Sequence, residues 1–216
     1  MRQTAIWFHS GTIKLQGYCY YPETDGTFPA VVLCHPHSLN GGSMSNLVIR
    51  TLGKALAVRS MIAVMFNFRG VAKSEGSYDA GIGEQDDLIA ALDWTVSQKE
   101  VDKERIGAAG YSFGGSVALP VASRDPRIKA LALISPALDS SHIPHLKQYT
   151  GPKLIISGAE DELILPGNIE LWNREAAEPK YMEFIEGADH FWFGMDDIVA
   201  DRVAGHFERF LVKNGG

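Results

Sequence analysis

One stretch near the middle of the chain, residues 105–123, constrains the fold more than any other. It begins with a short apolar segment, Arg105 to Tyr111, that is typical of a buried strand, and it continues over residues 114–122 as the start of a helix. Ser112 stands at the corner, inside the sequence Gly-Tyr-Ser-Phe-Gly. A strand that becomes a helix within one residue strains the backbone of that residue, and glycines two positions to either side remove the Cβ atoms that would block the turn. The pattern therefore predicts a serine hydroxyl held clear of a sheet, at the positive end of a helix.

Composition limits the class of protein. The chain has 216 residues, enough for one domain with a sizeable core, and its 45% hydrophobic and 21% charged residues are ordinary for a globular protein. A net charge of −6 disfavours nucleic acid or an anionic membrane as a partner. The apolar run at the N-terminus is too short for a signal peptide, and no stretch is long enough to span a membrane. Cys19 and Cys34 are expected to be buried free thiols, and a cytoplasmic monomer or homodimer is the default expectation.

Apolar periodicity predicts the remaining elements. Strands are expected at residues 4–8, 13–21, 30–34, 61–66, 105–111, 128–134, 154–157 and 180–185, and helices at 43–59, 84–99, 114–122, 166–176 and 196–212. The first two strands are expected to form an antiparallel hairpin at one sheet edge. Pro120 should kink the central helix or end it early, because proline removes a helical hydrogen bond.

Short apolar strands that alternate with amphipathic helices predict an α/β fold, with a mostly parallel central sheet covered by helices on both faces. No linker or repeat divides the chain, so a single domain is expected over residues 1–216. Two later loops carry polar residues that suit an activated serine. Residues 158–164 follow an apolar strand and contain Glu160, Asp161 and Glu162, and residues 186–193 follow the next strand and contain His190. A serine hydroxyl needs such a positioned base to act as a nucleophile.

Four places in the sequence together resemble one family. These are His-Pro-His at 35–37, Asn-Phe-Arg-Gly at 67–70, Gly-Tyr-Ser-Phe-Gly-Gly at 110–115, and the two acidic and histidine loops. From about residue 30 to residue 211 the chain resembles small α/β-hydrolases, and is similar to the lidless bacterial esterases related to dienelactone hydrolase. The resemblance implies an α/β-hydrolase fold and no cofactor. Dienelactone hydrolase uses a cysteine nucleophile, and dehalogenases and epoxide hydrolases use an aspartate, so a serine at this corner disfavours those activities.

The resemblance also implies roles for individual residues. Ser112 would be the nucleophile, His190 the base and Asp161 the acid that orients it, with Glu160 and Glu162 as rivals for the acid. Asp189 is expected to be a solvated or loop-capping carboxylate.

Two backbone N–H groups would stabilise the oxyanion of the reaction. One is that of Phe113, which follows the nucleophile. Because Pro36 has no N–H, His37 is the natural second donor, with Ser38 as its substitute. Ser38, Leu163, Phe191 and Trp192 are candidates for binding substrate.

Several alternatives stay open. His35 and His37, with His142 and His145, would suit a metal only weakly, because no carboxylate or cysteine partner stands at ligand spacing. We therefore predict no metal. Arg69 is expected to anchor its own loop rather than bind substrate carboxylates.

The segment between the strands at 128–134 and 154–157 is too short for a large lid. We therefore expect an open site for small or short-acyl esters. A thioesterase or small-amide hydrolase with the same residues, or a non-catalytic binding protein on the same scaffold, are the alternatives.

Overall fold

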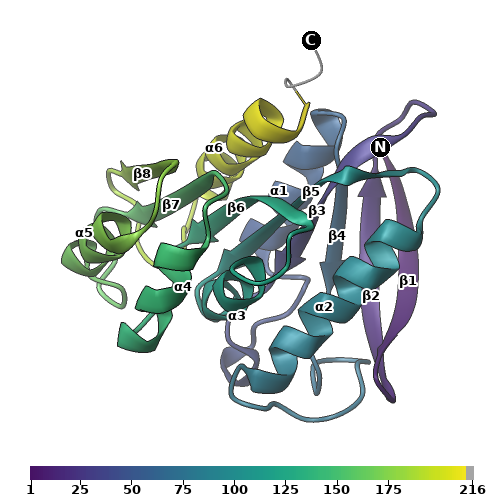
Figure 1. Ribbon diagram of the computed structural model, residues 1–216, viewed down its shortest axis with the longest axis horizontal. Coiled ribbons are helices and arrows are strands. Elements are labelled where there is room, and N and C mark those ends of the chain that lie inside the picture. Colours follow the sequence, from purple (N-terminus) through teal and green to yellow (C-terminus); the bar gives the residue numbers. More distant parts are fainter. Residues whose placement is uncertain (213–216) are drawn as a thin grey trace.

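The computed structural model describes residues 1–212 and shows one eight-stranded sheet (Figure 1). The strand order is β1-β2-β4-β3-β5-β6-β7-β8, and β2 runs in the opposite direction to all the other strands. The strands are β1 (Arg2–Ser10), β2 (Ile13–Tyr21), β3 (Phe28–Cys34), β4 (Ile62–Phe66), β5 (Val101–Tyr111), β6 (Ile128–Ile134), β7 (Lys153–Gly158) and β8 (Lys180–Ile185). All eight predicted strands are present, and the hairpin of β1 and β2 lies at the sheet edge as expected.

Helices cover both faces of the sheet. Alternate residues of β3 show this: Val32 packs among the side chains beneath α2 and α3, whereas Val31 and Leu33 pack beneath α1 and α6. The helices are α1 (Leu47–Val58), α2 (Ile82–Ser97), α3 (Phe113–Ala122), α4 (Ile143–Gln148), α5 (Pro166–Glu175) and α6 (Asp196–Phe207), with 3₁₀ turns η1 (Ser38–Asn40) and η2 (Ser140–His142) and a last π-helical turn η3 (Glu208–Val212). No helix within residues 1–212 is long and apolar enough to cross a membrane.

The helices differ from the sequence prediction in three places. The first helix begins at Leu47 rather than at Ser43, because the side chain of Asn46 accepts the N–H of Ile49 and caps the helix there. The segment before β7 forms the short helix α4, which apolar periodicity did not reveal. The last helix becomes π-helical after Phe207.

Pro120 lies inside α3, which ends two residues later. A proline at this position cannot donate to the carbonyl of Ser116, four residues earlier. That carbonyl instead lies 3.3 Å from Nε2 of His142, so the segment containing η2 and α4 supplies the missing donor. The helix continues two residues past the proline and ends at Ala122, and a neighbouring element compensates for the lost hydrogen bond.

Arg69, on the loop after β4, anchors that loop to α2 as predicted. Its backbone N–H and its guanidinium both donate to the carboxylate of Asp87, with Nη2 and Oδ1 at 2.8 Å. The side chain of Asp87 is fully buried and that of Arg69 is 12% exposed. The pair therefore ties the segment between β4 and α2 to α2.

We predict that Arg69→Ala lowers the free energy of unfolding by about 3 kcal/mol, because it leaves a buried carboxylate without its partner. Arg202→Ala is the control, since the Arg202–Glu183 pair lies at the surface with side chains 54% and 34% exposed. That change should cost less than about 1 kcal/mol. Urea unfolding measures both variants, and equal losses would contradict the anchoring role of Arg69.

Candidate active site

Ser112 occupies the strained corner that the sequence predicts. Its φ of 52° and ψ of −117° lie where residues other than glycine are rare. Its N–H donates to Ile134 at 2.8 Å, and its carbonyl accepts the N–H groups of Gly115 at 2.9 Å and Ala137 at 3.1 Å. Three backbone hydrogen bonds therefore hold the corner in its strained form.

The two motif glycines are required by close packing. A Cβ on Gly110 would lie 2.2 Å from the carbonyl oxygen of Gly114, and a Cβ on Gly114 would lie 2.2 Å from that of Cys34 at the end of β3. No side chain fits at either distance. Helix α3 can therefore start directly against the ends of β3 and β5 only with glycine at both positions.

The structure brings Ser112, Asp161 and His190 together at the carboxyl ends of β5, β7 and β8. Nε2 of His190 lies 3.1 Å from Oγ of Ser112, and its Nδ1 lies 2.9 Å from Oδ2 of Asp161. Because a carboxylate only accepts hydrogen bonds, Nδ1 carries the proton of the neutral ring and Nε2 offers its lone pair to the serine. Glu160 and Glu162, the rival acids, are exposed.

Asp161 is built into its loop as an ionised group. Its Oδ1 accepts the N–H groups of Leu163 at 3.0 Å and Ile164 at 2.7 Å, while Oδ2 faces His190. Burial acts to raise the pKa of Asp161, but the hydrogen bonds from His190 and Ile164 outweigh it and hold that pKa below its usual value. The carboxylate is therefore charged where it meets the imidazole.

Two buried serines extend this arrangement behind the acid. Oγ of Ser157, at the end of β7, donates to Oδ2 of Asp161 at 3.3 Å, and Oγ of Ser135 lies 3.2 Å from Oγ of Ser157. Both serines are fully buried. They were not singled out in the sequence, because a serine that ends an apolar strand has no distinguishing pattern.

The acid and histidine loops are locked to each other and to the corner. A Cβ on Gly158 would lie 2.1 Å from the carbonyl oxygen of Ala188, and the N–H of Glu160 donates to that same carbonyl at 2.9 Å. Tyr111, beside the serine, donates its hydroxyl to the backbone carbonyl of His190 at 2.6 Å. The sequence analysis did not assign this role to Tyr111. Its position directly before Ser112 was the only sequence feature that could have indicated it.

The two candidate oxyanion donors lie beside Ser112. Phe113 is the first residue of α3, so its N–H has no acceptor within the helix. His37 and Phe113 line one cavity with Ser112. The ring of His37 packs against those of Tyr78 and Phe113, with centroids 5.1 and 4.9 Å away, and its Nε2 lies 3.2 Å from the Tyr78 hydroxyl. These contacts fix the loop that carries the His37 backbone.

This cavity has a volume of about 450 Å³ and opens over Ser112 and His190. Leu163 and Phe191, predicted to bind substrate, line it and are 61% and 56% exposed. Leu163 lies two residues after Asp161 in the chain, and Phe191 directly follows His190. The walls nearest His190 are therefore apolar.

Two predicted pocket residues lie elsewhere. Trp192 does not line the cavity: it is 1% exposed and packs in the core under α6, where its large ring gains most from burial. Its neighbours Phe191 and Phe193 donate their N–H groups to Asp189, which caps the loop as expected. Ser38 also lies outside the cavity walls, because it begins the η1 turn with its Oγ buried in the protein.

The side chains of His35 and His37, in the loop after β3, make hydrogen bonds within the protein. His35 is fully buried, its Nε2 accepts the N–H of Phe68 at 3.1 Å, and its Nδ1 lies 2.7 Å from the carbonyl oxygen of Pro36. Burial lowers the pKa of His35 to about 4. No group of three or more potential metal ligands is found in the part of the chain that the structure describes.

Comparisons with known proteins agree with this architecture. Residues 10–146 match the family described as X-Pro dipeptidyl-peptidase (S15 family). An uncharacterized protein of Rickettsia prowazekii is 31% identical over 195 residues, which cover 87% of this chain and 81% of that protein.

Solved structures of α/β serine hydrolases have the same fold as this chain. An α/β serine hydrolase homologue from Coxiella burnetii is 31% identical, with a TM-score of 0.86 over 95% of this chain and 97% of that chain. An α/β serine hydrolase without a lid from Xanthomonas campestris is 28% identical, with a TM-score of 0.85 over 99% of this chain and 97% of that chain. The predicted fold class is confirmed.

The lowered pKa of Asp161 predicts how stability depends on pH. A carboxyl group whose pKa is depressed in the folded state contributes stability that is fully present above its ordinary pKa, near 4, and is lost as the pH falls through the folded-state value. We therefore expect the stability difference between the wild type and Asp161→Asn to shrink between about pH 6 and pH 2.

Urea unfolding at several pH values measures this difference. Glu162→Gln, which changes an exposed carboxylate on the same loop, is the matched control for the loss of a charge. A stability difference for Asp161→Asn that does not change with pH would contradict the assigned environment.

Proposed function

From the premise that the chain belongs to the X-Pro dipeptidyl-peptidase (S15) family of the α/β-hydrolase superfamily, we propose that it is a serine hydrolase that cleaves small or short-acyl carboxylic esters. The observation that carries the proposal is the continuous line of hydrogen bonds from Ser112 through His190 to Asp161, with separations of 3.1 and 2.9 Å. A nucleophile, a base and an orienting acid in contact are the elements that acyl transfer needs.

The reaction begins when Oγ of Ser112 attacks the ester carbonyl carbon while Nε2 of His190 takes the hydroxyl proton. The carbonyl π electrons move to its oxygen, and a tetrahedral intermediate forms. Its collapse breaks the bond to the alcohol oxygen, which leaves with the proton from His190. A water molecule then attacks the acyl-serine with His190 again as base, releasing the acid and restoring Ser112.

Asp161 and the backbone stabilise the charges that develop. The carboxylate holds the imidazole with Nε2 toward the serine and stabilises the imidazolium. The N–H groups of Phe113 and His37 would donate to the oxyanion, and one such donor is worth about 10²–10³ in rate. We propose these two groups because both residues line the cavity over Ser112.

The preference for small acyl groups rests on the size and openness of the site. The segment between β6 and β7 contains only η2 and α4, so no large lid covers Ser112. The cavity over the serine is about 450 Å³ and has its apolar side chains at the rim. A short acyl group fits such a space, and a long unsubstituted chain finds little enclosed apolar surface.

Hydrolysis of p-nitrophenyl acetate tests the proposal. Ser112→Ala and His190→Ala should each lower kcat/KM by about 10³-fold or more, since both residues take part in the same proton transfer. Ser97→Ala on α2 and His9→Ala on β1, both exposed, are matched controls that should retain wild-type activity. Wild-type activity in both Ser112→Ala and His190→Ala would contradict the proposed role of these residues.

A second candidate is cleavage of thioesters or small amides by the same residues. The description of the matched family names a peptidase, which supports amides as candidate substrates. Acetyl esters, thioesters and anilides assayed on the same preparations distinguish the three, and we expect the ester to have the highest kcat/KM. A higher value for either other substrate would replace the ester assignment while leaving the triad in place.

A further inference from the structure

We propose that the substrate's acyl group runs from Ser112 along the outer face of α3 into a second cavity. That cavity binds an uncharged hydrogen-bonding substituent of the acyl group, such as a hydroxyl. This inference rests on the proposed function and adds one class of longer acid, with a polar end, to the short acyl groups proposed above.

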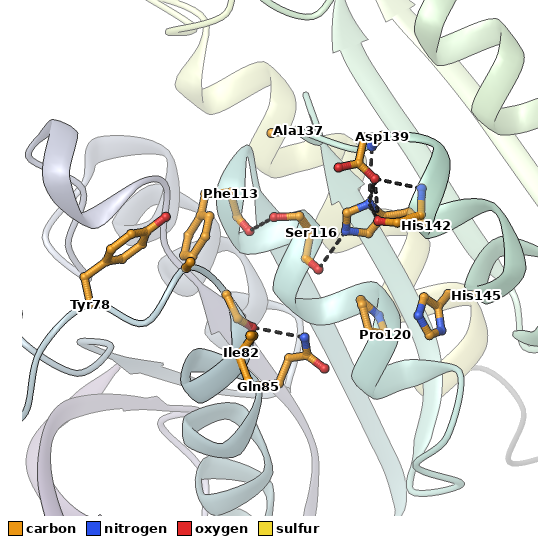
Figure 2. A pocket seen from close by; sticks show the side chains of 13 residues that line it. Tyr78, Ile82, Gln85, Phe113, Ser116, Pro120, Ala137, Asp139, His142 and His145 are labelled. Carbon is orange, nitrogen blue, oxygen red and sulfur yellow. Dashed lines mark hydrogen bonds and ion pairs between the residues drawn. The ribbon is translucent and has the colours of Figure 1, made fainter.

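The second cavity adjoins the first and has a volume of about 460 Å³. Figure 2 shows Tyr78 and Gln85 on one side of it, Asp139, His142 and His145 on the other, and α3 between them. The first group comes from the loop before α2 and from α2 itself, and the second from the segment that contains η2 and α4. The cavity therefore lies between α2 with its preceding loop and the segment that joins β6 to β7.

Three residues line both cavities and mark the passage between them: Phe113, Ser116 and Ala137. Ser116 and Pro120 are spaced by four residues on α3, so they follow one side of the helix, and Ser112 directly precedes its first turn. A rise of 1.5 Å per residue places the level of Ser116 about 6 Å from Ser112 and that of Pro120 about 12 Å away. A medium-length chain bound at Ser112 therefore reaches the second cavity.

The position of His190 decides which part of the ester enters it. The leaving alcohol receives its proton from Nε2 of His190, so it must lie on the histidine side of the serine. His190 and its neighbour Phe191 line the first cavity but not the second. The acyl part is thus the one directed toward Ser116 and beyond.

Polar groups in the second cavity call for a hydrogen-bonding partner. Ser123 donates its only hydroxyl proton to the carbonyl of Pro120 at 2.8 Å, so the 2.9 Å contact between its Oγ and Nδ1 of His145 requires a proton on Nδ1. The neutral ring then presents Nε2 as an acceptor. Gln85 donates its Nε2 to the carbonyl of Gly81 at 3.0 Å, and its Oε1 has no hydrogen bond within residues 1–212. Two acceptors are therefore available to a donor on the substrate.

The one carboxylate that lines this cavity is already hydrogen-bonded within its own loop. Asp139 contacts Nδ1 of His142 at 2.9 Å and accepts the N–H of Ser141 at 2.8 Å. Burial, with His142 and Arg124 nearby, lowers the pKa of His145 and favours its neutral form. A plain hydrocarbon chain would desolvate these polar groups without replacing their hydrogen bonds, which disfavours it. An uncharged donor suits the site better than an alkyl, carboxylate or ammonium end.

Matched p-nitrophenyl esters test the inference on the wild-type protein. The acids are octanoate and its 8-hydroxy, 8-carboxy and 8-amino derivatives, with acetate as a reference. One neutral hydrogen bond predicts that kcat/KM for the 8-hydroxy ester exceeds that for octanoate by about fivefold or more, and that it exceeds both charged esters. Equal values for the hydroxylated and plain esters, or preference for a charged one, would overturn the inference.

Variants locate the effect, and the ratio of the 8-hydroxy to the octanoate rate on one preparation cancels any loss of folded enzyme. Gln85→Met removes the amide at nearly constant size and should lower that ratio. Gln98→Met is the matched control, because Gln98 at the end of the same helix makes a similar bond, from its Nε2 to the carbonyl of Trp94. Ser116→Leu and Ala137→Leu fill the passage by two independent routes and should bring the ratio to about one.

An unchanged ratio in the passage variants would also overturn the inference. The two hypotheses fail in different ways. If the proposed function is wrong, the wild-type protein does not hydrolyse the acetate ester. If only the inference is wrong, the acetate ester is still hydrolysed.

Discussion

The strained backbone of Ser112 is the constraint on which the rest of the site depends. A φ of 52° is costly for serine and persists because the surrounding structure determines it. Its three backbone hydrogen bonds come from β6, from α3 and from the segment after β6, so several elements must fold before the corner is stable. Close packing of Gly110 and Gly114 then leaves no room for relaxation. The serine hydroxyl is therefore presented at a fixed point on the sheet edge.

Topology supplies the partners of that hydroxyl. β5, β7 and β8 are parallel, and their carboxyl ends meet at one edge of the sheet. Residues far apart in the sequence thus reach one point. Direct contacts refine this placement: the carbonyl of Ala188 joins the two loops, and the hydroxyl of Tyr111 holds the backbone of His190. Ser157 supports Asp161 from behind. The imidazole is therefore oriented by contacts from three different elements of the fold.

The sequence was sufficient where a local pattern determines the structure. Alternating and continuous apolar runs placed every strand, and the Gly-Tyr-Ser-Phe-Gly motif with its flanking segments placed the corner at Ser112. Asp161 and His190 followed from the resemblance to a family rather than from periodicity. The apolar runs and the Gly-Tyr-Ser-Phe-Gly motif are local patterns, because each involves only residues that are close together in the sequence.

Features that depend on tertiary contacts were not predictable in the same way. Trp192 follows His190 directly, yet the turn of the loop buries it in the core instead of the pocket. Ser38 turns its hydroxyl inward for the same reason. The short helix α4 has too few residues for a periodic signal, and His142 became informative only through its contact with the carbonyl that Pro120 leaves free.

Covalent labelling with a fluorophosphonate, followed by digestion and mass spectrometry, tests most directly whether the strained serine is an activated nucleophile. The reagent forms a stable bond with the serine oxygen that a neighbouring base has made nucleophilic. The account predicts one labelled peptide that contains Ser112, with labelling much slower in the variant His190→Ala. Labelling at another residue, or none while ester hydrolysis proceeds, would contradict it.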